Sequence, residues 1–178
     1  MSGTSGETSA AQHEAQAAQE IPSVRVAVVT VSDTRTEETD TSGRLLREML
    51  GADGHTVVFS RIVKDDVEQI HHALNDAIGD PDCDAIIFNG GTGIARRDTT
   101  FDVLDRMLEK RLVGFGEIFR HLSYEEIGPA AIMSRATAGT YRNRIVISIP
   151  GSSAAVRLAL EKLIRPQLPH MVWELVRQ

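Results

Sequence analysis

The sequence has one cysteine, few aromatic residues and no long apolar stretch, and each scarcity argues against a class of protein. Cys83 has no second cysteine with which to form an internal disulfide, so we expect a cytoplasmic protein. No stretch approaches the roughly 20 apolar residues of a membrane-spanning helix, so no membrane partner is expected. Aromatic residues make up 4% of the chain and the net charge is −6, which argues against nucleic acid as a partner.

Residues 1–20 are rich in Ser, Gly, Ala, Gln and Glu and contain no apolar residue larger than alanine after Met1. Such a segment buries too little apolar surface to offset the entropy lost on ordering. The remaining chain is long enough, and apolar enough, for one complete core. We therefore predict a disordered N-terminal tail over residues 1–20 and one globular domain over residues 21–178.

Four short segments are almost continuously apolar, which is typical of strands buried on both faces of a parallel sheet. They alternate with segments whose apolar residues have helical spacing. Strands that alternate with helices predict a three-layer α/β/α sandwich with a mainly parallel sheet. The expected strands are residues 24–31, 55–63, 84–88 and 145–149.

A glycine-rich segment, Asn89-Gly90-Gly91-Thr92-Gly93-Ile94-Ala95-Arg96-Arg97-Asp98-Thr99-Thr100, follows the third expected strand and leads into a helix. Glycines let the backbone approach a ligand closely, and a helix N-terminus offers free N–H groups to an anion. The segment lacks the Gly-Lys-Ser/Thr of a P-loop, and Arg96 stands where a dinucleotide fingerprint has its third glycine. A nicotinamide-linked oxidoreductase is therefore disfavoured. A tight turn with Asp98 or Thr99 as helix cap is the simpler alternative.

Four polar loops follow the expected strands, and in parallel sheets such loops gather at the edge where ligands bind. A carboxylate beside bound phosphate requires a cation, and Mg²⁺ is bound by one or two carboxylates plus phosphate oxygens. Asp98 is the first candidate carboxylate, and Asp65, after the second strand, is the second. For Asp65, a role as a helix cap and a role as a metal ligand are equally consistent with the sequence, whereas for Asp66 the helix cap is the favoured role. Arg97, with Arg96, provides positive charge for phosphate.

The other two loops contain Ser32-Asp33 and Pro150-Gly151-Ser152. Ser32 and Asp33 suit the binding of a nucleotide and suit an ordinary turn equally well. The second loop opens a helix, so it offers either an anion site or a plain cap. Two such helix starts in one cleft favour a substrate with phosphates at both ends.

Several motifs, in this order, resemble the MoaB/MogA family of molybdenum cofactor biosynthesis proteins, to which gephyrin domains are related. The resemblance runs from about Val24 to Leu168, and two segments resemble the MoaB branch in particular. The motifs are Thr30-Val31-Ser32-Asp33, Gly90-Gly91-Thr92-Gly93 with Arg97-Asp98-Thr99-Thr100, and Ile149-Pro150-Gly151-Ser152; the branch segments begin at Gly114-Phe115-Gly116 and Ser134-Arg135.

The resemblance implies that the protein binds molybdopterin and adenylylates it with Mg-ATP before metal insertion. It places the two functional aspartates at Asp65 and Asp98, as Mg²⁺ ligands. It assigns phosphate binding to the glycine loop and pterin contacts to Pro150-Gly151-Ser152, with Ser134 and Arg135 as further candidates. It also implies a homo-oligomer, with a hexamer favoured over a trimer, and other cofactor-biosynthesis proteins as partners. A non-catalytic molybdopterin-binding scaffold is the alternative function.

Overall fold

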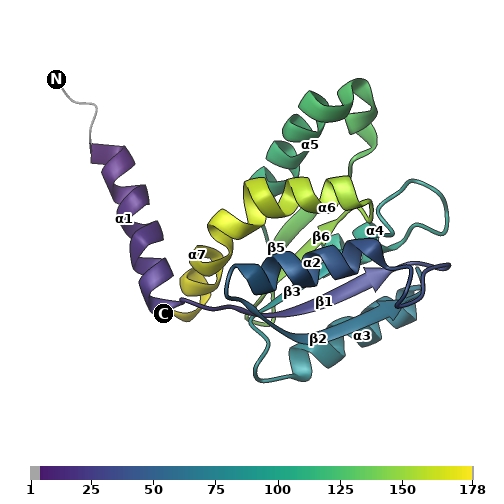
Figure 1. The fold of residues 1–178 in the computed structure, drawn as a ribbon, viewed down its shortest axis with the longest axis horizontal. Coiled ribbons are helices and arrows are strands. Elements are labelled where there is room, and N and C mark those ends of the chain that lie inside the picture. The colour runs from purple at the N-terminus through teal and green to yellow at the C-terminus, as the bar shows by residue number, and fades with distance from the viewer. Residues whose placement is uncertain (1–4, 178) are drawn as a thin grey trace.

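The computed structural model of the protein describes residues 5–177. One six-stranded sheet lies between two layers of helices, in the order β2-β1-β3-β6-β5-β4 (Figure 1). Its strands are β1 Arg25–Val31, β2 Thr56–Val63, β3 Ala85–Asn89, β4 Lys110–Arg111, β5 Thr137–Tyr141 and β6 Arg144–Ile149. The helices are α1 Ser5–Glu20, α2 Thr41–Ala52, α3 Val67–Gly79, α4 Thr100–Met107, α5 Val113–Ile127, α6 Ser153–Ala159 and α7 Arg165–Val176.

The sheet is parallel across β2, β1, β3 and β6, and β5 and β4 are added antiparallel at one edge. The predicted three-layer α/β fold with a mainly parallel sheet is confirmed, and so are all four expected strands. Sequence patterning missed β4 and β5. The first has two residues, and the second, Thr-Ala-Gly-Thr-Tyr, has no apolar run that would mark it as a strand.

Alternate residues of the buried strands serve two separate cores. Val26 and Val28 of β1 face one core, which is covered by α2, α5, α6 and α7. Ala27 and Val29 face the other core, which is covered by α3 and α4. This period of two explains why the strands are apolar throughout, since both faces are buried. The carboxyl ends of the four parallel strands consequently lie along one edge, between the two helical layers.

The last helices run on from one another. Between α6 and α7 lies a π-helical turn, η2, over Leu160–Ile164. Pro166 lies at the start of α7 and Pro169 lies inside it. Proline lacks an N–H and crowds the preceding turn, so it interrupts regular α-helical bonding. Within the described residues, no helix is long and apolar enough to cross a bilayer.

The N-terminal segment differs from the expectation of disorder over residues 1–20. The structure describes a helix, α1, that lies beside α7 and extends away from the sheet (Figure 1). Ala17 is fully buried, and Trp173 donates its indole N–H to Glu20 at 2.7 Å. The expectation rested on the lack of large apolar residues in this segment. It overlooked the high helix propensity of its alanines, and it could not show that Ala17 would be buried. Residues 1–4 lie outside the described part of the chain.

Candidate functional site

The four predicted loops meet at the carboxyl edge of the parallel strands. Ser32 N–H donates to Val63 O at 2.8 Å, which joins the ends of β1 and β2. Gly90 N–H donates to Ile149 O at 3.0 Å, which joins the ends of β3 and β6. A Cβ on Gly151 would lie 2.9 Å from Gly90 Cα, so the two glycine turns pack backbone to backbone. Sequence order and sheet topology were sufficient to predict this convergence.

The glycine loop has a conformation that side chains would obstruct. Gly90 and Gly91 have φ angles of +108° and +63°, which favour glycine. A Cβ on Gly91 would run into Thr100 Oγ1 and would lie 2.5 Å from Asp65 Oδ2. The Thr99 side chain makes no capping bond at the start of α4. The helix cap offered as the simpler explanation is therefore not formed by Thr99, and the Phe101 N–H at the start of α4 donates to Gly91 O at 3.4 Å.

The amide groups of residues 91–94 make no hydrogen bond within residues 5–177. Successive unpaired N–H groups in a glycine turn form a concave anion site. Asp98 lies against this turn, since its Oδ2 accepts the Ala95 N–H at 2.9 Å and a Cβ on Gly93 would run into the same oxygen. Arg96 and Arg97 are exposed on the outer side of the loop. The loop can therefore receive a phosphate group, with positive charge available at its rim.

Asp65 ties the end of β2 to the start of α4. Its Oδ1 accepts three hydrogen bonds, from Thr99 N–H at 3.0 Å, Thr99 Oγ1 at 2.9 Å and Thr100 Oγ1 at 3.1 Å. Its own N–H donates to Asp33 Oδ1 at 3.2 Å. Asp66 caps α3 by accepting the Gln69 N–H, as the sequence favoured. Asp65 therefore does not cap α3. Its Oδ2 accepts no hydrogen bond from any residue that the structure describes.

Asp65 and Asp98 together offer oxygen ligands of the kind that Mg²⁺ prefers. Asp98 Oδ1 and Asp65 Oδ2 accept no hydrogen bond within the described residues. No group of three or more His, Cys, Asp or Glu side chains in residues 5–177 could hold a metal by itself. Mg²⁺ commonly keeps several water and phosphate ligands, so two carboxylates suit it. The residues present fit a magnesium ion that arrives with a phosphate substrate.

Ser32 and Asp33 line a pocket of about 400 Å³ between the ends of β1 and β2. Ser32 Oγ accepts N–H groups from Thr34 at 3.3 Å and Arg35 at 3.2 Å, which is the turn chemistry considered from the sequence. Asp33 is exposed except for its bond to Asp65. Lys64 also lines the pocket and adds a positive charge. The pocket can therefore hold a polar group next to Asp33 and Lys64.

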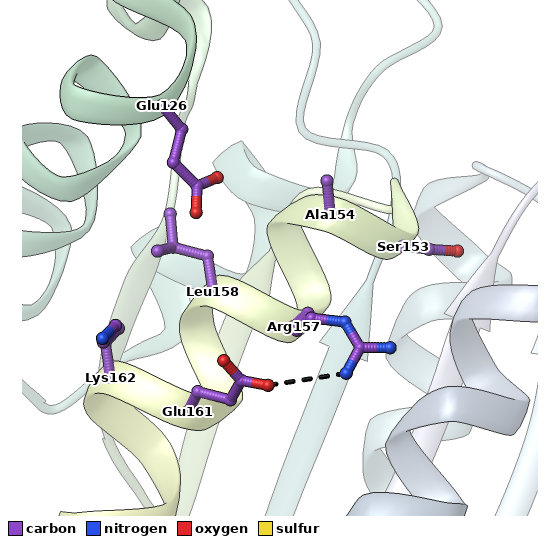
Figure 2. Close-up of a pocket in the computed structure, with 7 residues that line it drawn as sticks. All are labelled: Glu126, Ser153, Ala154, Arg157, Leu158, Glu161 and Lys162. Atoms are coloured by element: carbon purple, nitrogen blue, oxygen red, sulfur yellow. Dashed lines mark hydrogen bonds and ion pairs between the residues drawn. The ribbon is translucent and has the colours of Figure 1, made fainter.

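The Pro150-Gly151-Ser152 turn opens α6. Ser152 Oγ accepts the Ala155 N–H at 3.2 Å, so this residue is a helix cap, one of its two expected roles. Beyond this cap, a separate pocket of about 270 Å³ lies between α6 and the end of α5 (Figure 2). Arg157 on its floor pairs with Glu161 at 3.4 Å. Glu126 and Lys162 also line it, and none of the predicted site residues does.

Sequence reasoning missed a buried polar cluster under the site. Asp40 is 1% exposed and accepts hydrogen bonds from Thr30 Oγ1 at 2.7 Å and from Arg35. Arg35 also donates to Ser42 and, at 3.0 Å, to the Gly151 carbonyl. Ser42 in turn donates to Asn89 Oδ1 at 2.8 Å. The cluster connects the ends of β1, β3 and β6, and its only sequence signal was an aspartate before a helix.

Ser134 and Arg135 lie at the end of η1, a 3₁₀ segment over Gly128–Met133 that follows α5. Arg135 reaches the glycine loop, donating to Thr92 O at 2.8 Å and to Gly93 O. Ser134 is half-buried beside it. The structure thus brings Arg135 to the predicted site, where it contacts protein backbone. The pterin contact of Ser134 stays a prediction, and that of Arg135 is the alternative to the backbone role that these bonds indicate.

The single thiol is not part of this site. Cys83 is a free, fully buried cysteine before β3, and burial raises the pKa of its thiol to about 11. A thiol with that pKa carries almost no thiolate at neutral pH, so it is a poor nucleophile. The structural role favoured from its sequence context is consistent with this environment.

Comparisons with known proteins agree with the motifs. A family model described as "Probable molybdopterin binding domain" matches residues 27–170. A Bacillus anthracis protein named molybdenum cofactor biosynthesis protein B is 52% identical over 171 residues, which cover 96% of this chain and 99% of that protein. A crystal structure of molybdenum cofactor biosynthesis protein B has a TM-score of 0.85 at 52% identity, covering 88% of this chain and 98% of that chain.

A more distant structure extends the agreement. The tungsten cofactor synthesizing protein MoaB from Pyrococcus furiosus has a TM-score of 0.78 at 39% identity, covering 85% of this chain and 96% of that chain. Asp65, the glycine loop and the Pro150 turn all lie inside the range that the family model matches. The chain therefore belongs to the MoaB/MogA family of molybdenum cofactor biosynthesis proteins, on its MoaB branch.

Proposed function

We propose that the protein adenylylates molybdopterin with Mg-ATP, which prepares the pterin for metal insertion. The observation that carries the proposal is that the Asp65 carboxylate lies against Gly91 and the Asp98 carboxylate against Gly93, in a glycine loop with unpaired amides. Unpaired amides and two carboxylates at one loop are difficult to reconcile unless a cation and a phosphate bind together. Mg-ATP supplies both.

In the proposed reaction, a terminal phosphate oxygen of molybdopterin attacks the α-phosphorus of ATP. The bond from that phosphorus to the oxygen bridging to the β-phosphate breaks, and pyrophosphate leaves with the electron pair. Such a transfer depends on position and charge neutralisation. Mg²⁺ bound to Asp65 and Asp98 would neutralise the triphosphate, and the amides of residues 91–94 would hold its oxygens. Arg97 at the loop rim would stabilise the charge of the leaving group.

The pterin side of the cleft is assigned to the remaining loops. Ser32 and Asp33 border the 400 Å³ pocket, and Gly151, next to Ser152, packs against Gly90 of the glycine loop. The Arg35 bond to the Gly151 carbonyl ties the two loops at 3.0 Å. This link fixes the distance between the two halves of the cleft, so a substrate with separated phosphates can be held in one orientation.

Product formation tests the proposal directly. The full chain, incubated with molybdopterin, ATP and Mg²⁺, should release pyrophosphate and yield adenylylated molybdopterin in equal amounts. Asp98→Asn should reduce turnover by at least about 100-fold, since it removes charge stabilisation worth about 2.7 kcal/mol or more in comparable sites. Asp76→Asn is a matched control, because Asp76 pairs with Arg61 on the exposed face of α3. Normal turnover by Asp98→Asn would contradict the mechanism.

A molybdopterin-binding scaffold is the second candidate, because the family match by itself supports binding. A scaffold would bind molybdopterin and show no Mg-dependent heat on titration with ATP. Tight ATP binding that disappears when Mg²⁺ is chelated would support the enzyme instead. The single buried cysteine suits either role in a reducing compartment, which we propose to be the cytoplasm.

We also propose that the chain forms a homo-oligomer, with a hexamer favoured and a trimer as the alternative. Helix α5 and η1 extend from the domain and bear exposed apolar side chains (Figure 1). Ile132 is 82% exposed, and Tyr124 and Ile127 are more than half exposed. Exposed large apolar side chains at neighbouring positions, such as Tyr124 and Ile127 one helical turn apart, are typical of interaction sites. Sedimentation velocity should show an assembly that Ile132→Lys dissociates, and a monomeric wild-type protein would refute this.

A further inference from the structure

Arg135 is held in place by a dense set of contacts around the glycine loop. Its Nε donates to Thr92 O at 2.8 Å and its Nη2 donates to Gly93 O. Its Nη1 donates to both carboxylate oxygens of Asp102, each at 3.1 Å. The guanidinium carbon lies 4.6 Å from the centre of the Phe101 ring. Since Phe101 and Asp102 belong to α4, Arg135 connects that helix to two successive carbonyls of the loop.

These two carbonyls determine where two amides point. A peptide unit is planar and trans, so its C=O and the N–H of the next residue point in opposite directions. Thr92 O and Gly93 O are turned toward Arg135, so the N–H groups of Gly93 and Ile94 are turned away from it. These are two of the loop amides that have no hydrogen-bond partner within the described residues. Glycine at position 93 would otherwise leave the loop free to rotate these peptide units.

We propose that Arg135 is a positioning residue that orients the Gly93 and Ile94 amides toward the phosphates of the nucleotide. This inference rests on the proposed function for the identity of the ligand. Arg135 acts through the backbone and does not itself bind the nucleotide. Its guanidinium has five N–H groups, and its contacts with Thr92, Gly93 and Asp102 engage all three nitrogens. Stacking on Phe101 covers one face, so no bidentate fork is left for a phosphate.

Trypsin provides a test that needs no activity. Arg96 and Arg97 are exposed in the same loop, and cleavage there reports how often the loop opens. Arg135→Met removes every donor, and Arg135→Lys keeps the charge but cannot bond both carbonyls in the same geometry. We expect Arg135→Met to raise the initial cleavage rate after Arg96 and Arg97 by about tenfold, as loss of charged hydrogen bonds implies. Arg135→Lys should give an intermediate rate, and it also serves if the Met variant does not fold.

Arg111→Lys is the matched control, because Arg111 also binds α4, through Asp105, and donates to no carbonyl of the loop. It should match the wild-type protein. In the same series, the Kd and KM for Mg-ATP should rise by about tenfold for Arg135→Met, whereas the KM for molybdopterin should not change. A general structural defect would raise both constants together.

The outcomes separate this inference from the proposed function. A wild-type cleavage rate in Arg135→Met, or faster cleavage with unchanged ATP affinity, would overturn the positioning role. An equal rise in the KM values of both substrates would overturn it as well. If the wild-type protein bound no ATP, the proposed function would fail, and the cleavage rates would still decide whether Arg135 holds the loop.

Discussion

Replacing Asp65 should separate a structural role from a chemical one, because its two carboxylate oxygens have different surroundings. Oδ1 accepts three hydrogen bonds from Thr99 and Thr100, and Oδ2 faces the glycine loop. Asp65→Asn keeps an oxygen that can accept the same three bonds and removes the charge. Asp65→Ala removes both. We expect the two variants to be equally inactive but to differ in stability.

The magnitude follows from the three donors. A hydrogen bond to a charged group contributes about 1.5–3 kcal/mol when buried, and Asp65 is half-buried, so each bond is worth less. The two hydroxyl donors can also rotate toward water in Asp65→Ala, although Thr100 is fully buried. We therefore expect Asp65→Ala to lower the free energy of unfolding by about 2–4 kcal/mol. Asp65→Asn should cost about 1 kcal/mol or less, since its amide oxygen can still accept all three bonds, although each is weaker without the charge.

Thermal unfolding and turnover measured on the same samples check this reasoning. For a chain of this length, a 1 kcal/mol loss lowers Tm by about 2–4 °C. Asp65→Ala should therefore unfold about 4–16 °C below the wild-type protein, and Asp65→Asn within about 4 °C of it. Equal Tm losses in the two variants would refute the assignment of the hydrogen bonds to Oδ1. Near-normal turnover in Asp65→Asn would refute the metal-binding role.

Three further predictions concern the loop, a helix cap and a buried histidine. Gly91→Ala should abolish ATP binding in a titration, since its Cβ would displace Thr100 and Asp65, whereas Gly51→Ala, with open space around it, should not. Ser152→Ala should lower the free energy of unfolding in urea by about 1 kcal/mol through loss of the α6 cap, whereas Ser153→Ala should not. Burial lowers the pKa of His55, whose Nδ1 accepts the Val24 N–H at 3.2 Å. The unfolded chain binds the proton first, so stability should be full above pH ~6.5 and fall as pH decreases below it; His55→Gln, in a urea series across pH 5–8, should flatten this slope.

The arrangement of the site could be predicted from local patterns wherever the topology of the sheet determines which loops meet. The continuous apolar runs of β1 and β3 indicated burial on both faces, and burial on both faces required a parallel sheet. That sheet type then placed the Asp65 and Asp98 loops at one edge. The preference for Asp66 as a cap also followed from a local rule and is confirmed.

Features that depend on contacts between distant segments could not be predicted in this way. The Arg35–Asp40 ion pair could not be predicted, because charged residues in a polar loop ordinarily face solvent. The pair is buried only by the packing of α2, β1 and α6. The resemblance made Arg135 a candidate for the pterin, and nothing local indicated that it would turn toward Thr92 and Gly93. The docking of α1 is of the same kind, since it depends on Trp173, far along the chain.

The close approach of Gly90 and Gly151 has a consequence for how the site can vary between relatives. A side chain at Gly151 would strike the Gly90 backbone, so substitution there requires a simultaneous movement of the Gly90 turn. Two turns that constrain each other in this way are a poor place for gradual change in substrate preference. The exposed residues 94–96 have no such neighbours. Natural drift and laboratory selection for new nucleotide preferences should therefore accumulate in that short exposed arc, with the glycine pair unchanged.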